Sequence, residues 1–381
     1  MSDKWQEYYS RLNTFIDSHT DIVVEPSRVV IPQSVRIEYY EHFNNVRKAF
    51  IREKHPNTTS DCLPLINEYK KTRDNVIQIL ELEKMTIDAS LERFLINPVE
   101  ELMVDLFHPL FDLLKGKIDF DYFESLCSDA ITKSLHSYFK SGYELWVMLS
   151  LVQMLEPEKL LSVSMRQPSD VGAVVYLSDK NGIEVPPPAE TKRLCIDITR
   201  KAPLMVPDLI IHSKILGKYI SFRQQFNNSL TNATNASEAR EWIPLESGIV
   251  NTGSILIFTA GDPVELALVG DAKKTCRPDI IIECRTTDDW YKINGNHNID
   301  LNNKKILNPK FGSYIVTPRD IPSEIDIKDS TLEPTVKGLS DQFGEGSHIK
   351  PSGDVLVIGF DSSNLAPIIG NLTDQQKSSI E

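Results

Sequence analysis

Apolar side chains recur every three or four positions through the first third of the chain. The earliest series consists of Trp5, Tyr8, Tyr9, Leu12 and Phe15, and further series lie within residues 39–51, 64–84 and 98–116. Such spacing gathers the apolar side chains on one side of a helix. The series over 64–84 should begin near Pro64, and the series over 98–116 should end at Gly116. We therefore predict a helical domain over residues 1–135 that packs internally, dimerises or binds a partner.

A strongly apolar helix is expected next, from residue 137 to Leu155, where Glu156-Pro157 ends it. Glu144 falls in the first turn of this expected helix. A carboxylate is favoured there, because the backbone N–H groups at a helix start carry partial positive charge. Glu144 is therefore either an ordinary helix-start residue or part of a site.

Beyond Pro157 the pattern changes to short β-branched and aromatic runs between turn residues. These runs predict strands at 173–177, 183–185, 194–198, 206–212, 218–223, 254–258, 313–316 and 354–360. The first two strands form a hairpin. A capped helix over 361–369 follows the last strand, and the polar tail from Thr373 should be frayed. The fold class is α/β (α+β), with a helical domain before a mixed-sheet domain over 136–381.

Two apolar runs, 266–273 and 277–283, follow each other with a short link at 274–276. Neither run alternates with polar residues, which is typical of strands buried on both faces. The first run ends in Asp271 and Lys273. Charged groups at the end of a buried strand are costly to desolvate, so this placement favours a chemical site.

Composition narrows the class of protein. The chain has 381 residues and a net charge of −13, which argues against a protein that coats nucleic acid through its overall charge. Its five cysteines are scattered, as expected for a reducing cytoplasm. The longest apolar runs fall short of a membrane span, and residues 1–20 lack a secretory signal pattern. We expect a cytoplasmic protein that does not enter membranes.

Three segments of the second domain form a pattern. They are the helix with Tyr143-Glu144-x-Trp146, the strand with Val206-Pro207-Asp208, and the strand ending in Gly270-Asp271-Ala272-Lys273. In this order they resemble the PD-(D/E)xK nuclease superfamily, and most of all its McrC-like branch of restriction and phage-defence nucleases. The resemblance spans residues 143–317 and implies a restriction-endonuclease-like mixed sheet.

The resemblance implies a metal-dependent endonuclease that cleaves DNA. Mg²⁺ or Mn²⁺ would neutralise the phosphate and activate water, and Mg²⁺ prefers carboxylate oxygens. The resemblance assigns Asp208 and Asp271 as metal ligands at the ends of adjacent strands, with Glu144 as a third acid. Lys273 would orient the water or stabilise the developing charge. DNA, an ATPase, helicase or sensor subunit, and a second copy of the chain are the implied partners.

The sequence departs from the family pattern at two points. The interval from Asp208 to Asp271 is long, and a second Pro-Asp pair, ending at Asp279, follows the Asp-x-Lys motif. A competing assignment uses Asp279 and Glu283 with Arg285. Those two acids share one strand and would lie about 13 Å apart along it, too far for one metal ion. We therefore prefer the first assignment, with Asp279 as a supporting carboxylate beside Lys273.

Because the net charge of the chain is negative, contacts with DNA would have to come from local basic residues. We assign this role to Lys214, Lys218, Arg223, Lys304 and Lys305, beside polar loops at 226–240 and 286–303 that would flank the DNA. Two other readings stay open. The chain is either a non-catalytic subunit of nuclease-like fold that binds a partner or nucleic acid, or an unrelated α/β hydrolase or ligand-binding protein. If the candidate residues form no site, they are charges at strand ends that pair with one another.

Overall fold

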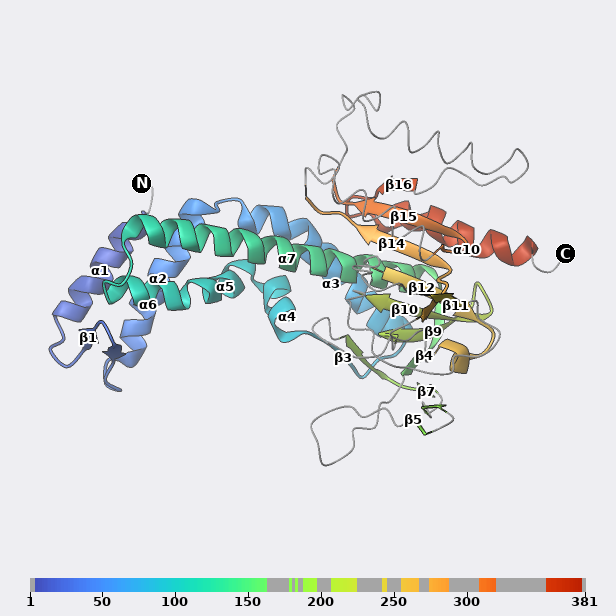
Figure 1. Cartoon of the computed structure of the whole chain (residues 1–381), viewed down its shortest axis with the longest axis horizontal. Helices are drawn as coiled ribbons and strands as arrows, with labels where there is room; N and C mark the ends of the chain where they lie inside the picture. The colour runs from blue at the N-terminus through green and yellow to red at the C-terminus, as the bar shows by residue number, and fades with distance from the viewer. Residues whose placement is uncertain are drawn as a thin grey trace, which may run out of the picture. The chain divides into compact units, whose positions relative to one another are not determined.

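The protein divides into two compact units, which Figure 1 shows as a computed structural model. The structure describes residues 4–162, 178–179, 182–183, 188–196, 207–224, 242–244, 255–266, 274–287, 308–319 and 354–378. The first unit comprises Met1–Asn67 with Ala89–Gly142, and the second comprises Glu68–Asp88 with Tyr143–Glu381. Residues 68–88 thus belong to the unit that contains the sheet, although they continue the helical pattern of the N-terminal part.

Helices build the first unit. They are α1 (Trp5–Asp17), α2 (Arg36–Lys54), α4 (Ala89–Ile96), α5 (Pro98–Leu102), η1 (Met103–Leu106), α6 (Phe107–Leu114), and the first parts of α3 (Thr58–Ile79) and α7 (Phe120–Met154). A small hairpin of β1 (Val23–Glu25) and β2 (Arg28–Val30) joins α1 to α2. The core is rich in aromatic side chains, including Trp5, Tyr39, Phe43, Phe50 and Phe123, none of which is exposed.

Two helix boundaries predicted from the sequence are wrong. The series over 98–116 is not one helix but α5, η1 and α6, with Pro109 in the first turn of α6. Proline is tolerated there because first-turn N–H groups have no partner within the helix. Likewise α3 begins at Thr58 and contains Pro64 in its interior.

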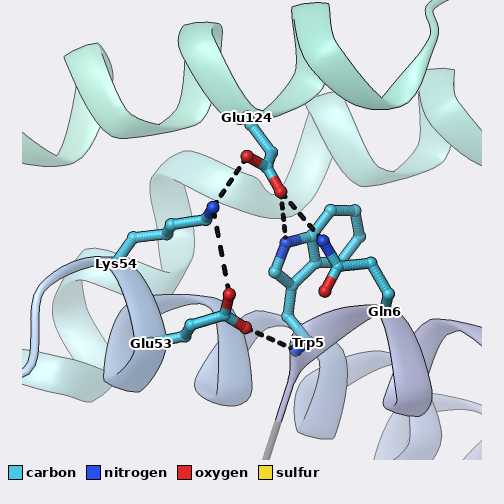
Figure 2. Close-up of polar contacts among 5 residues, drawn as sticks. All are labelled: Trp5, Gln6, Glu53, Lys54 and Glu124. Carbon is cyan, nitrogen blue, oxygen red and sulfur yellow. Dashed lines mark hydrogen bonds and ion pairs between the residues drawn. The ribbon is translucent and has the colours of Figure 1, made fainter.

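A polar network ties three helices of the first unit together (Figure 2). Glu124 of α7 accepts hydrogen bonds from Trp5 Nε1 at 2.8 Å, Gln6 Nε2 at 2.9 Å and Lys54 Nζ at 2.7 Å. Glu53 of α2 accepts one from the backbone N of Trp5 at 2.8 Å. The hydrogen bond from Lys54, followed by that from Trp5, lowers the pKa of Glu124. The carboxylate therefore stays charged to lower pH than an isolated glutamate.

The helix that carries Glu144 is longer than predicted. It is α7, which runs from Phe120 to Met154 without interruption, so Glu144 lies well inside it and not in its first turn. Gly142 is a close-packing position within this helix. A Cβ atom there would lie 3.1 Å from Leu95 Cδ2 and 3.2 Å from Leu65 Cδ2. The glycine is therefore explained by side-chain packing.

The second unit is built on an eight-stranded mixed sheet with the order β16-β15-β14-β12-β10-β9-β4-β7. Its strands are β4 (Pro157–Ser162), β7 (Ala189–Glu190), β9 (Leu209–Ser213), β10 (Lys218–Gln224), β12 (Ile255–Ala260), β14 (Ile280–Cys284), β15 (Gly312–Thr317) and β16 (Asp354–Val357). β14, β15 and β16 pair in parallel, and the other neighbours are antiparallel. With the helical N-terminal region, this sheet confirms the α/β class.

Smaller ladders and helices complete the second unit. β3 (Lys84–Ile87) pairs in parallel with β8 (Arg193–Ile196), β5 (Ser178–Asp179) pairs with β6 (Gly182–Ile183), and β11 (Trp242–Pro244) pairs with β13 (Lys274–Cys276). The helices are η2 (Pro263–Leu266), η3 (Ser362–Leu365) and α10 (Ala366–Ser378). None of the helices in the described ranges is long and apolar enough to span a membrane.

The structure corrects the prediction for the stretch around Asp271. Residues 274–276, expected to be a link, form the strand β13, and its partner is β11. Leu266, expected in a strand, ends the short helix η2. The remainder of that expected strand, 267–273, lies outside the described residues. At the C-terminus, α10 extends to Ser378, past the point where the tail was expected to fray.

Candidate functional site

The two faces of the central sheet differ in polarity. Residues paired across a ladder point to the same face, and successive residues point to opposite faces. The registers put these residues on one face, here called the helix-covered face: Leu209, Ile211, Ile220, Phe222, Ile255, Ile257, Ile280 and Ile282. The other, here called the charged face, carries Asp208, Ile210, Ser221, Arg223, Leu256, Phe258, Ile281 and Glu283.

Helices cover the first of these faces. Ser213 Oγ at the end of β9 donates to the carbonyl of Leu155 after α7 at 2.6 Å. Tyr314 of β15 is hydrogen-bonded to Asn371 of α10. The short helix η2 packs against β10 and β12. The polar residues of the charged face are nevertheless buried, with exposed fractions of 1% for Ser221, 7% for Arg223 and 8% for Glu283.

Asp208 pairs with Arg223 on the neighbouring strand. Asp208 precedes β9, and its backbone N donates to the carbonyl of Phe222 on β10 at 2.9 Å. This pairing puts Arg223 directly opposite Asp208. Arg223 Nη1 lies 3.5 Å from Asp208 Oδ1, and the two side chains are 9% and 7% exposed. The first acid of the predicted site thus faces a cation rather than a second carboxylate.

The predicted placement of Asp208 and Asp271 on adjacent strands stays a prediction. In the described sheet, β9 lies between β10 and β4, so both of its edges are paired. Asp271 and Lys273 themselves lie outside the described residues. The strand that follows them, β13, belongs to the two-stranded sheet with β11.

Glu144 lies on the long helix α7 and not on a strand of the sheet. It is fully buried on α7. The preceding residue, Tyr143, donates from its hydroxyl to the carbonyl of Gly359 at 3.4 Å, just beyond β16, and burial raises the pKa of this phenol. At the other end of α7, Leu155 contacts β9. The helix therefore crosses the sheet, and Glu144 lies on the β14–β16 side.

Glu283 and Arg285, the competing pair, lie toward the end of β14 that is level with Asp208. Arg285 follows this strand, and its backbone N donates to the carbonyl of Val316 at 2.9 Å. β14 is three strands away from β9, or about 14 Å at about 4.8 Å per strand. Glu283 and Asp208 therefore do not share one metal ion, whose ligand distances are about 2 Å.

Asp279 has a structural role that the sequence did not predict. Its carboxylate accepts hydrogen bonds from the backbone N of Thr259 and from Thr259 Oγ1, the latter at 2.8 Å. Lys310 Nζ lies 3.4 Å from Asp279 Oδ1, and the Asp279 side chain is 2% exposed. Ile257 is the last residue of β12 that pairs with β14. The Asp279 carboxylate thus supplies the next hydrogen-bond acceptor along β12, at Thr259.

Replacing Asp279 by alanine should lower the free energy of unfolding by about 2–3 kcal/mol, because it leaves the N–H of Thr259 without its acceptor. Asparagine at the same position keeps one oxygen acceptor and should cost less. Urea denaturation followed by circular dichroism measures both changes. An alanine variant as stable as the wild type would contradict the structural role.

The basic residues assigned to DNA fall in different surroundings. Lys214 is exposed in the turn between β9 and β10, and Lys218 begins β10. This turn is at the opposite end of the sheet from Asp208, about 20 Å away over six strand residues at about 3.3 Å each. Arg223 is buried against Asp208. Lys304 and Lys305, and most of the two predicted loops, lie outside the described residues.

The described residues do not form a metal site. Among them, no three His, Cys, Asp or Glu side chains lie close enough together to hold a metal ion. Of the predicted metal ligands, Asp208 is the one whose contacts are described most fully, and its carboxylate lies against the guanidinium of Arg223. The arrangement at Asp208 therefore does not fit a bound Mg²⁺ ion as it stands.

Sequence reasoning missed the pairing of Asp208 with Arg223. The sequence contained a signal for this pairing, because Lys214–Gly217 is typical of a turn. The two strands that flank such a turn pair with each other, so residues at equal distances from the turn lie opposite each other. Counting back from the turn to Asp208 and forward to Arg223 would have placed the two residues opposite each other. Arg223 had instead been assigned to the DNA surface.

Comparison with known proteins adds no family to this picture. No protein-family model, no curated protein and no solved structure matches the chain.

Proposed function

We propose that the chain is a metal-dependent endonuclease that cleaves DNA, in a bacterial restriction or phage-defence system. The observation that supports this most is the concentration of buried charge on one face of the sheet. Asp208, Arg223 and Glu283 lie on the charged face toward one end of the strands, whereas Leu209, Phe222, Ile255, Ile257, Ile280 and Ile282 lie on the opposite face. Buried charges that packing does not require are typical of functional sites.

The sequence motif supplies the rest of the proposal. Asp271 and Lys273, in the Gly-Asp-Ala-Lys motif, are the residues that the family resemblance assigns to catalysis. A divalent ion, Mg²⁺ or Mn²⁺, would supply charge neutralisation and an activated water when bound. Of this chain's own residues, Asp271 would contribute a carboxylate for the ion, and Lys273 would contribute a cation for the developing charge.

A second candidate function is nucleic-acid or partner binding without catalysis. The contact between Asp208 and Arg223 favours it, because the carboxylate that the resemblance assigns to a metal ion lies against a guanidinium. Under this reading, the helical unit or the charged face binds a partner, and the nuclease-like motif is vestigial.

One assay tests both functions. The purified full chain is incubated with plasmid DNA and with RNA, in Mg²⁺, Mn²⁺ or EDTA, alone and with candidate ATPase or sensor subunits. The nuclease proposal expects DNA cleavage that needs the metal ion. Cleavage that persists in EDTA contradicts it. DNA binding without cleavage in any combination favours the binding-only function.

A further inference from the structure

We propose that the first half of α7 is a docking face for a basic amphipathic helix of a partner protein. Two large side chains of this helix, Tyr122 and Leu126, are 57% and 39% exposed. They lie about one turn apart and therefore on the same side of α7. The inference goes beyond the proposed function, because the helical unit contains none of the residues assigned to catalysis.

Acidic side chains surround these two residues. Asp121 directly precedes Tyr122, and Asp129 lies about two turns further along the same side of the helix. Asp119 caps the helix, because its Oδ1 accepts a hydrogen bond from the backbone N of Tyr122 at 2.8 Å. All three carboxylates are exposed, and within the described part of the chain none of them has a cation at ion-pair distance. The docking face is therefore apolar at its centre and negative around it.

The fourth acid of this stretch has a different role. Glu124 points into the helical unit, where it accepts hydrogen bonds from Trp5, Gln6 and Lys54 (Figure 2). Lys54 balances its charge at 2.7 Å. The acids of this part of α7 thus divide into one that holds the unit together and three that face outward. Only the outward three add negative charge to the docking face.

This charge pattern selects the occupant. A second copy of the chain would bring the same acids together in a two-fold contact, and like charges repel. Nucleic acids carry negative charge as well. A helix with lysine or arginine beside an apolar stripe is complementary, because its apolar side chains cover Tyr122 and Leu126 while its cations meet the carboxylates. A helix also suits the surface, since α7 uses its backbone hydrogen bonds internally and offers a partner only side-chain packing.

Two model peptides test the docking face on the full chain. One is an amphipathic helix of leucine and lysine, about 15 residues or four turns long, and the other has glutamate at every lysine position. Fluorescence anisotropy of the labelled peptides measures binding. The lysine peptide should bind at least tenfold more tightly than the glutamate peptide, and added salt should weaken it because exposed charges are screened. Tyr122→Ser/Leu126→Ser should bind the lysine peptide at least tenfold more weakly than the wild type does.

Charge reversal distinguishes the docking face from the negative charge of the whole chain. Asp121→Lys/Asp129→Lys should invert the preference, so that the glutamate peptide binds more tightly than the lysine peptide. The matched control is Glu38→Lys/Glu41→Lys on α2, which changes the net charge by the same amount. Both pairs consist of exposed acids, and each includes one in the first turn of its helix. The control should keep the preference of the wild type.

The remaining outcomes decide against the docking face. Equal changes in the α2 control and the α7 reversal would mean that peptide binding follows net charge alone. Equal binding of the two peptides by the wild type also overturns the proposal. A dimer in sedimentation experiments that Tyr122→Ser/Leu126→Ser dissociates would assign the face to a second copy instead. If the reversal variant does not fold, the serine variant decides, with Ile37→Ser as its exposed control. None of these measurements depends on DNA cleavage, so the proposed nuclease function is tested separately.

Discussion

Replacing Trp5 by alanine should lower the free energy of unfolding of the helical unit by about 3–5 kcal/mol, the usual cost of removing a large buried aromatic side chain. Trp5 is fully buried and contacts the rings of Phe50, Phe120 and Phe123 at centroid distances of 5.7, 5.6 and 5.1 Å. The substitution leaves a cavity between α1, α2 and α7. It also removes the donor that bonds Glu124 at 2.8 Å.

Two further variants show how much of this loss of stability comes from ring packing and how much from the hydrogen bond, and they provide an exposed control. Trp5→Phe keeps most of the ring packing but loses the Nε1 donor, so its loss should be smaller, about 1–2 kcal/mol. Ile37→Ala, at a position that is 79% exposed, should change stability by less than about 0.5 kcal/mol. Urea unfolding followed at 222 nm measures all three. An alanine variant as stable as Ile37→Ala would show that this cluster does not hold the unit together.

Replacing Asp271 by alanine should reduce metal-dependent DNA cleavage to background, on the proposal that this carboxylate binds the ion. Lys273→Ala should also abolish or greatly slow cleavage, but it should leave metal binding intact because an ammonium is not a ligand. Cleavage is measured on plasmid DNA, and metal binding is measured separately by calorimetry.

The control for this pair is Asp262→Asn, an exposed carboxylate on the preceding turn that accepts a hydrogen bond from the backbone N of Val264 at 2.9 Å. Asparagine preserves that hydrogen bond, so this variant should retain both activity and stability. Full activity in Asp271→Ala would remove the residue from the site. Equal loss of metal binding in Asp271→Ala and Lys273→Ala would point to misfolding of the segment.

The elements with strong local signals were predictable from the sequence. The β-branched runs after Val206, Lys218 and Asp279 became β9, β10 and β14, because apolar side chains on both sides of a strand need cover on both faces. All five residues of β14 are buried, as its unbroken apolar run indicated. The order of the strands was not predictable, since pairing depends on contacts between distant segments.

The candidate site was harder to predict than the fold for the same reason. A short motif fixes residue types but not neighbours, so the contact between Asp208 and Arg223 did not follow from the motif. Asp279 was expected to be a supporting carboxylate, and the contacts of its carboxylate with Thr259 and Lys310 were not predicted. For both carboxylates, the register of the sheet determines which side chains they contact.

The parallel pairing of β3 with β8 has a consequence for biosynthesis. Lys84 pairs with Arg193 and Ile87 with Ile196, so β3 leaves the ribosome long before its partner exists. At about 5–20 residues per second, the delay is on the order of 5–20 s. During that interval the strand edge of β3 has no partner, and the second unit cannot close. A chaperone that shields nascent strands should therefore engage this chain after β3 has emerged and release it once β8 has been made.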